Sequence, residues 1–191
     1  MKEPVSEQSI DCTHSVTVKE GFVIWLTGLS GSGKSTLALE LSAKLNTFIH
    51  TEILDGDQVR QNLSKGLSFS KEDRDENVNR IGFVANLIAR TGGCCIVAVI
   101  SPYKESRELQ RQRITNFFEI YCTCPIEKLI ERDTKGLYKK AINGDINHFT
   151  GINDPYEEPD NPNLIIDSNK LSIEESVNII LSKIKELFIN Q

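Results

Sequence analysis

The residues from Gly28 to Thr36 read GLSGSGKST and fit the pattern G-x-x-x-x-G-K-[ST]. Glycines suit such a loop because its backbone must turn tightly and point N–H groups at phosphate oxygens. Lys34 places a charge near the β- and γ-phosphates, and the Ser35 hydroxyl suits Mg²⁺. The loop residues predicted to bind a nucleotide triphosphate are Gly28, Leu29, Ser30, Gly31, Ser32, Gly33, Lys34, Ser35 and Thr36.

Two carboxylates follow in the segment LDGDQVR, residues 54–60. Asp55 and Asp57 lie two residues apart, directly after an apolar run. Carboxylates beside a phosphate site can join the Mg²⁺ shell or accept the proton of an attacking hydroxyl. The alternative is a turn in which Asp55 and Gly56 only cap the next helix. Spacing alone does not decide between the two.

The elements that must position these residues alternate along the chain. Apolar runs predict buried strands at 21–27, 48–55, 92–101, 117–123 and 163–167. Helical spacing of apolar residues predicts helices at 34–45, 76–90 and 172–188, and we also expect helices at 106–114 and at 125–133, the latter opened by Pro125. This alternation predicts an α/β fold, a single domain whose parallel sheet is flanked by helices, with the glycine loop between its first strand and first helix.

Residues 134–162 break the alternation with Gly, Asn, Asp and Pro. An irregular stretch of this length in a compact domain is usually functional. We therefore expect a lid at about 133–162 within a single domain of residues 21–191, preceded by a loose polar leader at 1–20.

The composition excludes several other classes of protein. A net charge of −5 gives no broad basic surface for nucleic acid, and the longest apolar run, residues 94–100, is too short to cross a bilayer. The sequence thus predicts a cytoplasmic protein with no nucleic-acid or membrane partner. Five cysteines without a C-x-x-C pair favour buried free thiols over disulfides or zinc ligands.

Five segments, taken together, resemble adenylylsulfate kinases, a family of P-loop kinases. They read TGLSGSGKST, LDGDQVR, FSKEDRDENVNRIGF, ISPY, and KGLYKKA followed by FTGINDPYE. The resemblance runs from about residue 22 to residue 188. It implies a homodimer that uses Mg²⁺ and transfers the γ-phosphoryl group of ATP to the 3′-hydroxyl of adenylylsulfate (APS), giving 3′-phosphoadenylylsulfate (PAPS).

The resemblance also implies roles for individual side chains. Asp57 is the expected base or metal-shell carboxylate, and Ser35 and Asp57 are the expected metal-binding residues. The expected catalytic residues are Lys34, Asp57 and Ser101, and Arg132 is expected at the ATP. The implied acceptor-binding residues are Asp55, Arg60, Phe69, Arg74, Asn77, Ser101 and Lys135. Guanidinium groups suit an anionic phosphosulfate, and an aromatic face suits an adenine ring.

Ser101 ends a predicted strand, at the edge where open α/β sheets bind ligands. Some family members are reported to form a phosphoserine intermediate here. We favour direct in-line transfer, with Ser101 positioning the substrate, because Mg²⁺, Lys34 and a base already supply what the reaction requires. We interpret Tyr103 as a packing residue, favour Arg107 as an acceptor contact over a charge facing water, and assign no chemistry to the histidines.

Three positions differ from the usual family pattern: Ser68 replaces glycine, Asn79 replaces arginine and Asn153 replaces aspartate. The charge lost at Asn79 keeps open a second interpretation, a 3′-kinase for a related nucleotide such as a cytidine diphosphoramidate. A third is a nucleotide-binding regulator without turnover, against which the intact candidate site counts. An acceptor screen and an ATP-turnover assay would separate these interpretations.

Overall fold

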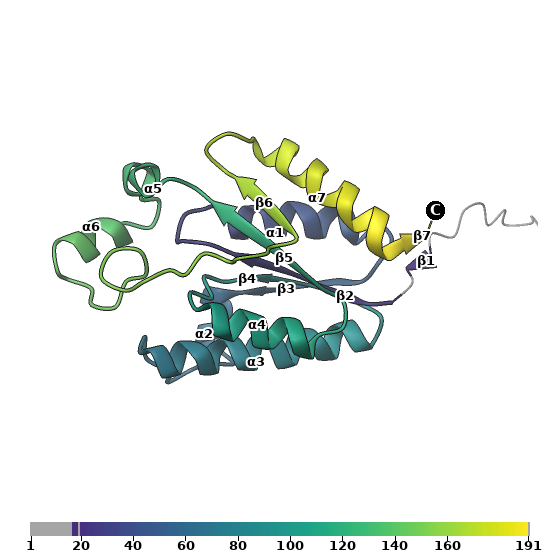
Figure 1. Ribbon diagram of the computed structural model, residues 1–191, viewed down its shortest axis with the longest axis horizontal. Coiled ribbons are helices and arrows are strands. Elements are labelled where there is room, and N and C mark those ends of the chain that lie inside the picture. Colours follow the sequence, from purple (N-terminus) through teal and green to yellow (C-terminus); the bar gives the residue numbers. More distant parts are fainter. Residues whose placement is uncertain (1–16, 19, 191) are drawn as a thin grey trace, which may run out of the picture.

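The computed structural model describes residues 17–18 and 20–190. Its centre is a parallel sheet of five strands in the order β3–β4–β2–β5–β6 (Figure 1). These strands are β2 Phe22–Thr27, β3 Thr51–Asp55, β4 Cys94–Ala98, β5 Phe117–Thr123 and β6 Leu164–Asp167. Trp25 in β2 pairs with Val97 of β4 on one side and with Glu119 of β5 on the other. The strand that leads into the glycine loop is therefore the central one.

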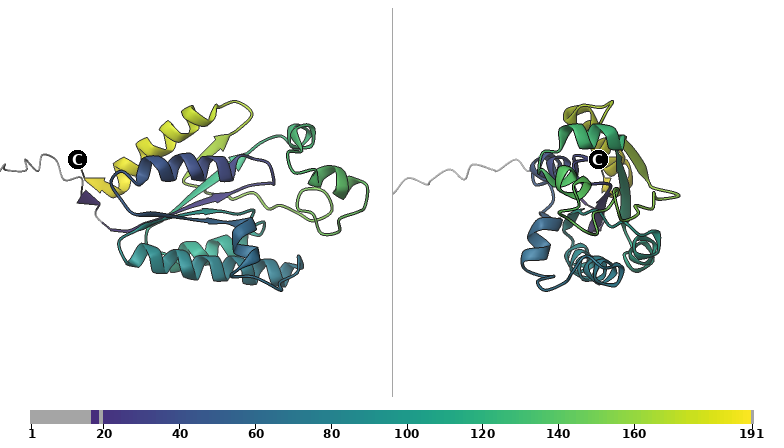
Figure 2. Two further views of the ribbon diagram at one scale, coloured as in Figure 1. Left: turned by 180° about the vertical axis from the view of Figure 1, so that it is seen from behind. Right: turned by 90° about the vertical axis from the view of Figure 1, so that its left-hand side faces the viewer.

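Helices cover both faces of this sheet (Figure 2). On one face lie α1 Lys34–Leu45 and α7 Ile173–Phe188. On the other lie α2 Gly56–Gln61, α3 Lys71–Arg90 and α4 Lys104–Arg113. Because both faces are covered, every residue of β2 is buried, which explains why its sequence is apolar throughout rather than alternating.

Two apolar clusters join these layers. Ile24 and Leu26 of β2 pack in the cluster under α1 and α7, whereas Val23 and Trp25 pack in the cluster over α3. Successive residues of a strand point to opposite faces, so β2 contributes to both clusters. Each fully buried Leu, Ile or Val contributes roughly 1.5–3 kcal/mol, and this packing fixes the carboxyl end of β2, where the glycine loop begins.

A smaller unit projects from the edge of the sheet formed by the carboxyl ends of the strands (Figure 1). It contains α5 Ile126–Arg132 and α6 Leu137–Ile142. A third apolar cluster includes Leu129, Tyr138 and Phe149, and the rings of Tyr138 and Phe149 meet edge to face at 5.0 Å. This unit includes most of the expected lid.

The lid differs from its prediction because α6 lies inside a stretch that we expected to lack regular structure. The Asp133 carboxylate accepts backbone N–H groups of Tyr138 and Lys139 in the first turn of α6, each at 3.0 Å. These bonds lower the pKa of Asp133. Capping by a side chain thus stabilises a helix that apolar periodicity did not reveal.

Side-chain caps also explain two other differences. The α3 helix begins at Lys71 rather than residue 76, because the Ser70 hydroxyl accepts the backbone N–H of Asp73. The short helix α2 was implied only by the capping alternative, and the Asp55 carboxylate does cap it by accepting the N–H of Asp57. The capping interpretation of Asp55 is therefore correct for one of its carboxylate oxygens.

Two further predictions concern the leader and the thiols. Two short strands, β1 Thr17–Val18 and β7 Ile189–Asn190, pair antiparallel, whereas most of the leader lies outside the described residues. The thiols of Cys94, Cys95, Cys122 and Cys124 are free and buried, as predicted, while Cys12 lies outside the described residues. Burial raises the pKa of Cys122 to about 12.

Within 17–18 and 20–190, no helix is both long and apolar enough to span a bilayer.

Candidate functional site

A cavity of about 590 Å³ lies at the carboxyl edge of the sheet, between the glycine loop, α2, α3 and the lid. It gathers most of the residues that the sequence singled out. Those lining it are Ser30, Gly31, Gly33, Lys34, Ser35, Thr36, Asp55, Asp57, Arg60, Phe69, Arg74, Asn77, Ser101 and Lys135. Segments that are far apart in the sequence therefore meet around one space, with the glycine loop at one part of the wall and the arginines at another.

The glycine loop has the backbone that its sequence predicts. Gly28, Gly31 and Gly33 have φ values of 148°, 78° and 91°, which side chains disfavour. A Cβ on Gly28 would lie 2.2 Å from the carbonyl oxygen of Cys122, so this position excludes any side chain. Among the described residues, no side chain caps α1 at Gly33. The positive end of α1 is thus directed to the cavity for an anion.

Lys34 is buried and folded back onto this loop. Its ammonium group donates to the carbonyl oxygens of Gly28 at 2.9 Å and Leu29 at 2.7 Å. Burial lowers the pKa of Lys34 to about 8, because desolvation disfavours its charged form. A polyphosphate bound in the loop would supply the negative charge that the buried ammonium lacks.

Oxygen atoms suited to a hard cation meet beside this lysine. The Ser35 hydroxyl donates to one carboxylate oxygen of Asp55 at 2.6 Å, and Asp57 follows two residues later on the cavity wall. Hydroxyl, carboxylate and phosphate oxygens are the ligands that Mg²⁺ prefers, usually with one or two carboxylates. The side chains present therefore fit a Mg²⁺ ion held jointly with the phosphates of ATP.

A second part of the cavity carries two guanidinium groups around an aromatic ring. The guanidinium carbon of Arg60 lies 4.2 Å from the centre of the Phe69 ring, and that of Arg74 lies 5.4 Å from it. The Phe69 side chain is 51% exposed, so its ring remains accessible. This combination presents positive charge beside a flat apolar surface, which suits an anionic nucleotide.

Arg74 is held by contacts on several sides. It donates to the carbonyl oxygens of Phe69, at 2.8 Å, and of His148, and it forms an ion pair with Asp154 at 3.3 Å. His148 has φ 62°, and its ring lies 3.3 Å from the same aspartate. Sequence reasoning gave no role to either residue, because their proximity to Arg74 depends on how the lid folds.

Asn77 and Phe149 complete this part of the cavity. Asn77 is buried, and its amide oxygen has no hydrogen-bond partner in the part of the chain that the structure describes. A buried acceptor of this kind usually has a partner, which makes it a candidate contact for a ligand N–H or hydroxyl. Phe149 lines the same cavity from the lid and was not predicted, although its segment, FTGINDPYE, had been singled out.

Ser101 lies at the cavity but its hydroxyl is already engaged. It donates to the Thr27 hydroxyl at 3.0 Å and accepts the indole N–H of Trp25 at 3.1 Å. The residue is buried and has φ 40°, a left-handed conformation that is costly for a serine. This arrangement favours the positioning role over a nucleophile.

Four predicted ATP-binding residues do not line this cavity. Gly28 and Ser32 are loop residues that are buried, and Leu29 lines a second cavity. Arg132 lies at the end of α5, where it donates to the carbonyl oxygen of Ser168 at 3.2 Å. Its assignment to ATP therefore stays a prediction that the cavity does not support directly.

Two polar residues that the sequence singled out lie away from the cavity wall. Asn79 accepts a hydrogen bond from the Gln110 side chain of α4 at 3.0 Å. Arg107, which we favoured as an acceptor contact, is buried against Glu119 at 3.1 Å. The packing interpretation of Tyr103 agrees with its burial.

Comparison with known proteins agrees with this arrangement. The family model described as adenylylsulphate kinase matches residues 20–167. The chain is 52% identical over 170 residues to an adenylyl-sulfate kinase of Microcystis aeruginosa, covering 88% of this chain and 94% of that protein. It is 60% identical over 168 residues to a probable bifunctional SAT/APS kinase of Sorangium cellulosum, covering 87% of this chain but only 29% of that longer protein.

Solved structures extend the comparison to three dimensions. The APS kinase CysC of Mycobacterium tuberculosis, in complex with AMPPNP and APS, matches with a TM-score of 0.84 and 42% identity, covering 87% of this chain and 98% of that one. A shikimate kinase of Aquifex aeolicus shares only the fold, at 19% identity and a TM-score of 0.55. The family match and the curated relatives show that this chain belongs to the adenylylsulphate kinase family.

Proposed function

We propose that this protein transfers the γ-phosphoryl group of ATP to the 3′-hydroxyl of APS, giving PAPS and ADP. One observation carries the proposal: a single cavity joins a phosphate-binding loop to an aromatic ring with two guanidinium groups, and Asp57 lies between these parts in the chain and on the same wall. The related M. tuberculosis enzyme, crystallised with AMPPNP and APS, supports the assignment of these two parts to ATP and APS.

The donor half acts by charge and backbone geometry. The glycine loop and the N-terminus of α1 bind the β- and γ-phosphates, and Lys34 exchanges its two carbonyl partners for phosphate oxygens. Its charge then stabilises the negative charge that moves toward the leaving ADP oxygen. A Mg²⁺ ion held by Ser35, Asp57 or both would neutralise phosphate charge.

The acceptor half orients the nucleophile. Phe69 and Phe149 offer apolar faces for the adenine, while Arg60 and Arg74 bind the phosphosulfate anion and the Asn77 amide oxygen accepts a ligand N–H or hydroxyl. The 3′-oxygen attacks the γ-phosphorus in line as the bond to the ADP oxygen breaks. Asp57 accepts the 3′-hydroxyl proton, so no serine intermediate is required.

Two broader features belong to the proposal. The protein acts as a homodimer, as the family resemblance implies, and works in the cytoplasm, where the sequence predicts it to lie. Both remain predictions, and sedimentation of the purified protein would test the first.

An acceptor screen tests the reaction itself. With Mg²⁺ and ATP, we expect APS to be phosphorylated far faster than AMP, shikimate or gluconate, since none of these presents both the base and the sulfated anion. Mass spectrometry would identify the product as PAPS. Rapid use of a cytidine diphosphate derivative, with no use of APS, would reject the proposed acceptor while leaving the family assignment unchanged.

A further inference from the structure

A buried ion pair lies beside the proposed site without lining its cavity. Arg107 in α4 and Glu119 in β5 have side chains that are only 3% and 5% exposed, and they approach to 3.1 Å. Burying two charges is unfavourable unless they are paired and also hydrogen-bonded, so such a pair requires an explanation. We propose that Arg107, held by Glu119, is a positioning residue for the acceptor half of the site; this inference rests on the proposed function.

The guanidinium group of Arg107 binds two backbone carbonyls from different segments. It donates to the carbonyl oxygen of Ser101 at 2.5 Å and to that of Glu157 at 2.6 Å. The planar guanidinium group can make these two contacts and the ion pair at the same time. A lysine ammonium group on its flexible side chain does not reproduce this geometry. Arg107 therefore joins the turn that follows β4, the strand β5 and the C-terminal part of the lid.

The segment from Asp154 to Glu158 receives further contacts on this side. The N–H of Glu157 donates to the Pro102 carbonyl at 2.9 Å, and the N–H of Lys104 donates to the Glu157 carboxylate at 2.7 Å. The Tyr156 ring centre lies 5.7 Å from the Arg107 guanidinium carbon. All of these contacts tie the segment to the turn that contains Ser101.

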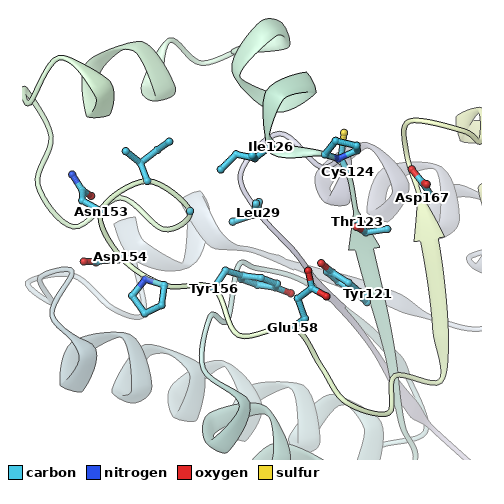
Figure 3. A pocket seen from close by; sticks show the side chains of 14 residues that line it. Leu29, Tyr121, Thr123, Cys124, Ile126, Asn153, Asp154, Tyr156, Glu158 and Asp167 are labelled. Atoms are coloured by element: carbon cyan, nitrogen blue, oxygen red, sulfur yellow. The ribbon is translucent and has the colours of Figure 1, made fainter.

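The opposite side of the same segment is packed only in part. A second cavity, of about 660 Å³, is lined by Asp154, Pro155, Tyr156 and Glu158, with Leu29 of the glycine loop across from them (Figure 3). In this view the Tyr156 ring lies against the Tyr121 ring, at a centroid distance of 5.9 Å. Since a cavity borders the segment here, its position depends strongly on the contacts with Arg107 and the Ser101 turn.

The Ser101 turn and the segment from Asp154 to Glu158, which Arg107 binds, both include or contact residues that we propose to bind APS. Asp154, three residues before Glu157, forms the ion pair with Arg74 and lies near His148. The Ser101 hydroxyl donates to the Thr27 hydroxyl, and the Thr27 hydroxyl in turn lies 2.9 Å from the Tyr156 hydroxyl. Loss of the Arg107 contacts would therefore displace Arg74 and Ser101 together, although Arg107 touches neither substrate.

The test uses Arg107→Lys in the full-length protein, with Arg111→Met as the matched control. Arg111 also binds Glu119, at 2.6 Å, but its other hydrogen bonds go to Asn161 and Asn163 rather than to Ser101 or Glu157. We expect Arg107→Lys to raise KM for APS or lower kcat by about 10-fold to 100-fold, the scale of a small misplacement of reacting groups. KM for ATP should change by less than about twofold, and Arg111→Met should leave both values near those of the wild type.

A double variant separates positioning from stability. Arg107→Met with Glu119→Gln removes both charges of the buried pair, and replacing buried ion pairs by uncharged groups is often neutral for stability. We expect a Tm close to that of the wild type but the same loss in APS use as Arg107→Lys. Hydrogen exchange without ligand should become faster at the Glu157 amide in both variants.

Three results would overturn the inference. These are unchanged APS kinetics in both Arg107 variants, equal rises in KM for ATP and APS, and unchanged hydrogen exchange at residues 151–158. A wild-type enzyme that does not phosphorylate APS would reject the proposed function instead, and the hydrogen-exchange result would still decide the positioning role by itself.

Discussion

The ammonium group of Lys135 lies 2.6 Å from a carboxylate oxygen of Asp57. This ion pair joins the beginning of the lid to the residue that we propose as the base. Both side chains are more than half exposed, so the pair contributes little to stability. Its importance is chemical, because the lysine occupies an oxygen of Asp57 that a Mg²⁺ ion or the acceptor hydroxyl would need.

The first prediction concerns Asp57. Asp57→Asn keeps the shape of the side chain and removes its charge, so we expect kcat to fall by about 10² to 10⁴ with a folded protein. Steady-state kinetics with APS and ATP would measure this. Lys135→Met is the control, because it removes the partner and leaves the carboxylate; it should retain far more activity. A rise in KM for ATP alone in Asp57→Asn would instead make Asp57 a binding residue.

The second prediction concerns the protonation of Lys34. Its pKa is lowered to about 8 in the free protein, and bound phosphates favour the charged form and raise that pKa. At about pH 9, ATP binding should therefore take up a proton, and affinity should fall as pH rises above about 8. Calorimetry in two buffers with different ionisation enthalpies would measure the uptake.

A conservative variant provides the control for this prediction. Lys34→Arg keeps the charge at all these pH values, so its ATP binding should take up no proton at this position. Lys34→Ala should lower turnover by about 10²-fold or more, the scale of losing one preorganised stabilising group. Proton uptake that persists in Lys34→Arg would assign the titration to another group.

The third prediction concerns Arg74 and the acceptor. Arg74→Ala should weaken acceptor use by about 1.5 to 3 kcal/mol, as for the loss of a charge-assisted contact, while ATP binding changes little. Arg80→Ala is matched to it, since Arg80 lies on the same helix and pairs with Glu76 at the surface. Equal losses for the two variants would mean that a charge on α3, rather than a contact, is responsible.

The fourth prediction concerns Ser101. Because its hydroxyl is bonded to Trp25 and Thr27, Ser101→Ala should retain substantial turnover but lose about 1 to 2 kcal/mol of unfolding free energy. Denaturant unfolding and steady-state kinetics would measure both. Radiolabel from γ-labelled ATP that accumulates on Ser101 at the rate of turnover would contradict direct transfer.

Sequence patterns predicted the sheet well because its three inner strands, β4, β2 and β5, are buried almost throughout and read as apolar runs. They missed α2 and α6 and the first turn of α3, because side-chain caps at Asp55, Asp133 and Ser70 define these elements within polar sequence. Such caps act through the geometry of two or three residues and leave no apolar periodicity to detect.

In the candidate site, too, sequence patterns predicted some features and missed others. The glycine loop was predictable because all its groups are adjacent in the chain, whereas the partnership of Arg74 with Asp154 depends on the folded lid. One signal for the burial of Arg107 was present in the sequence. Glu119 lies in the apolar strand FFEIYCT, and a carboxylate in the middle of a buried strand requires a cation from another element.

The pairing of β1 with β7 brings both ends of the described chain together at the end of the sheet opposite the lid (Figure 1). Additional protein joined at either end would therefore emerge away from the lid and from the cavity that the lid borders. This layout suits the Sorangium cellulosum relative, in which the matching segment makes up 29% of a longer chain.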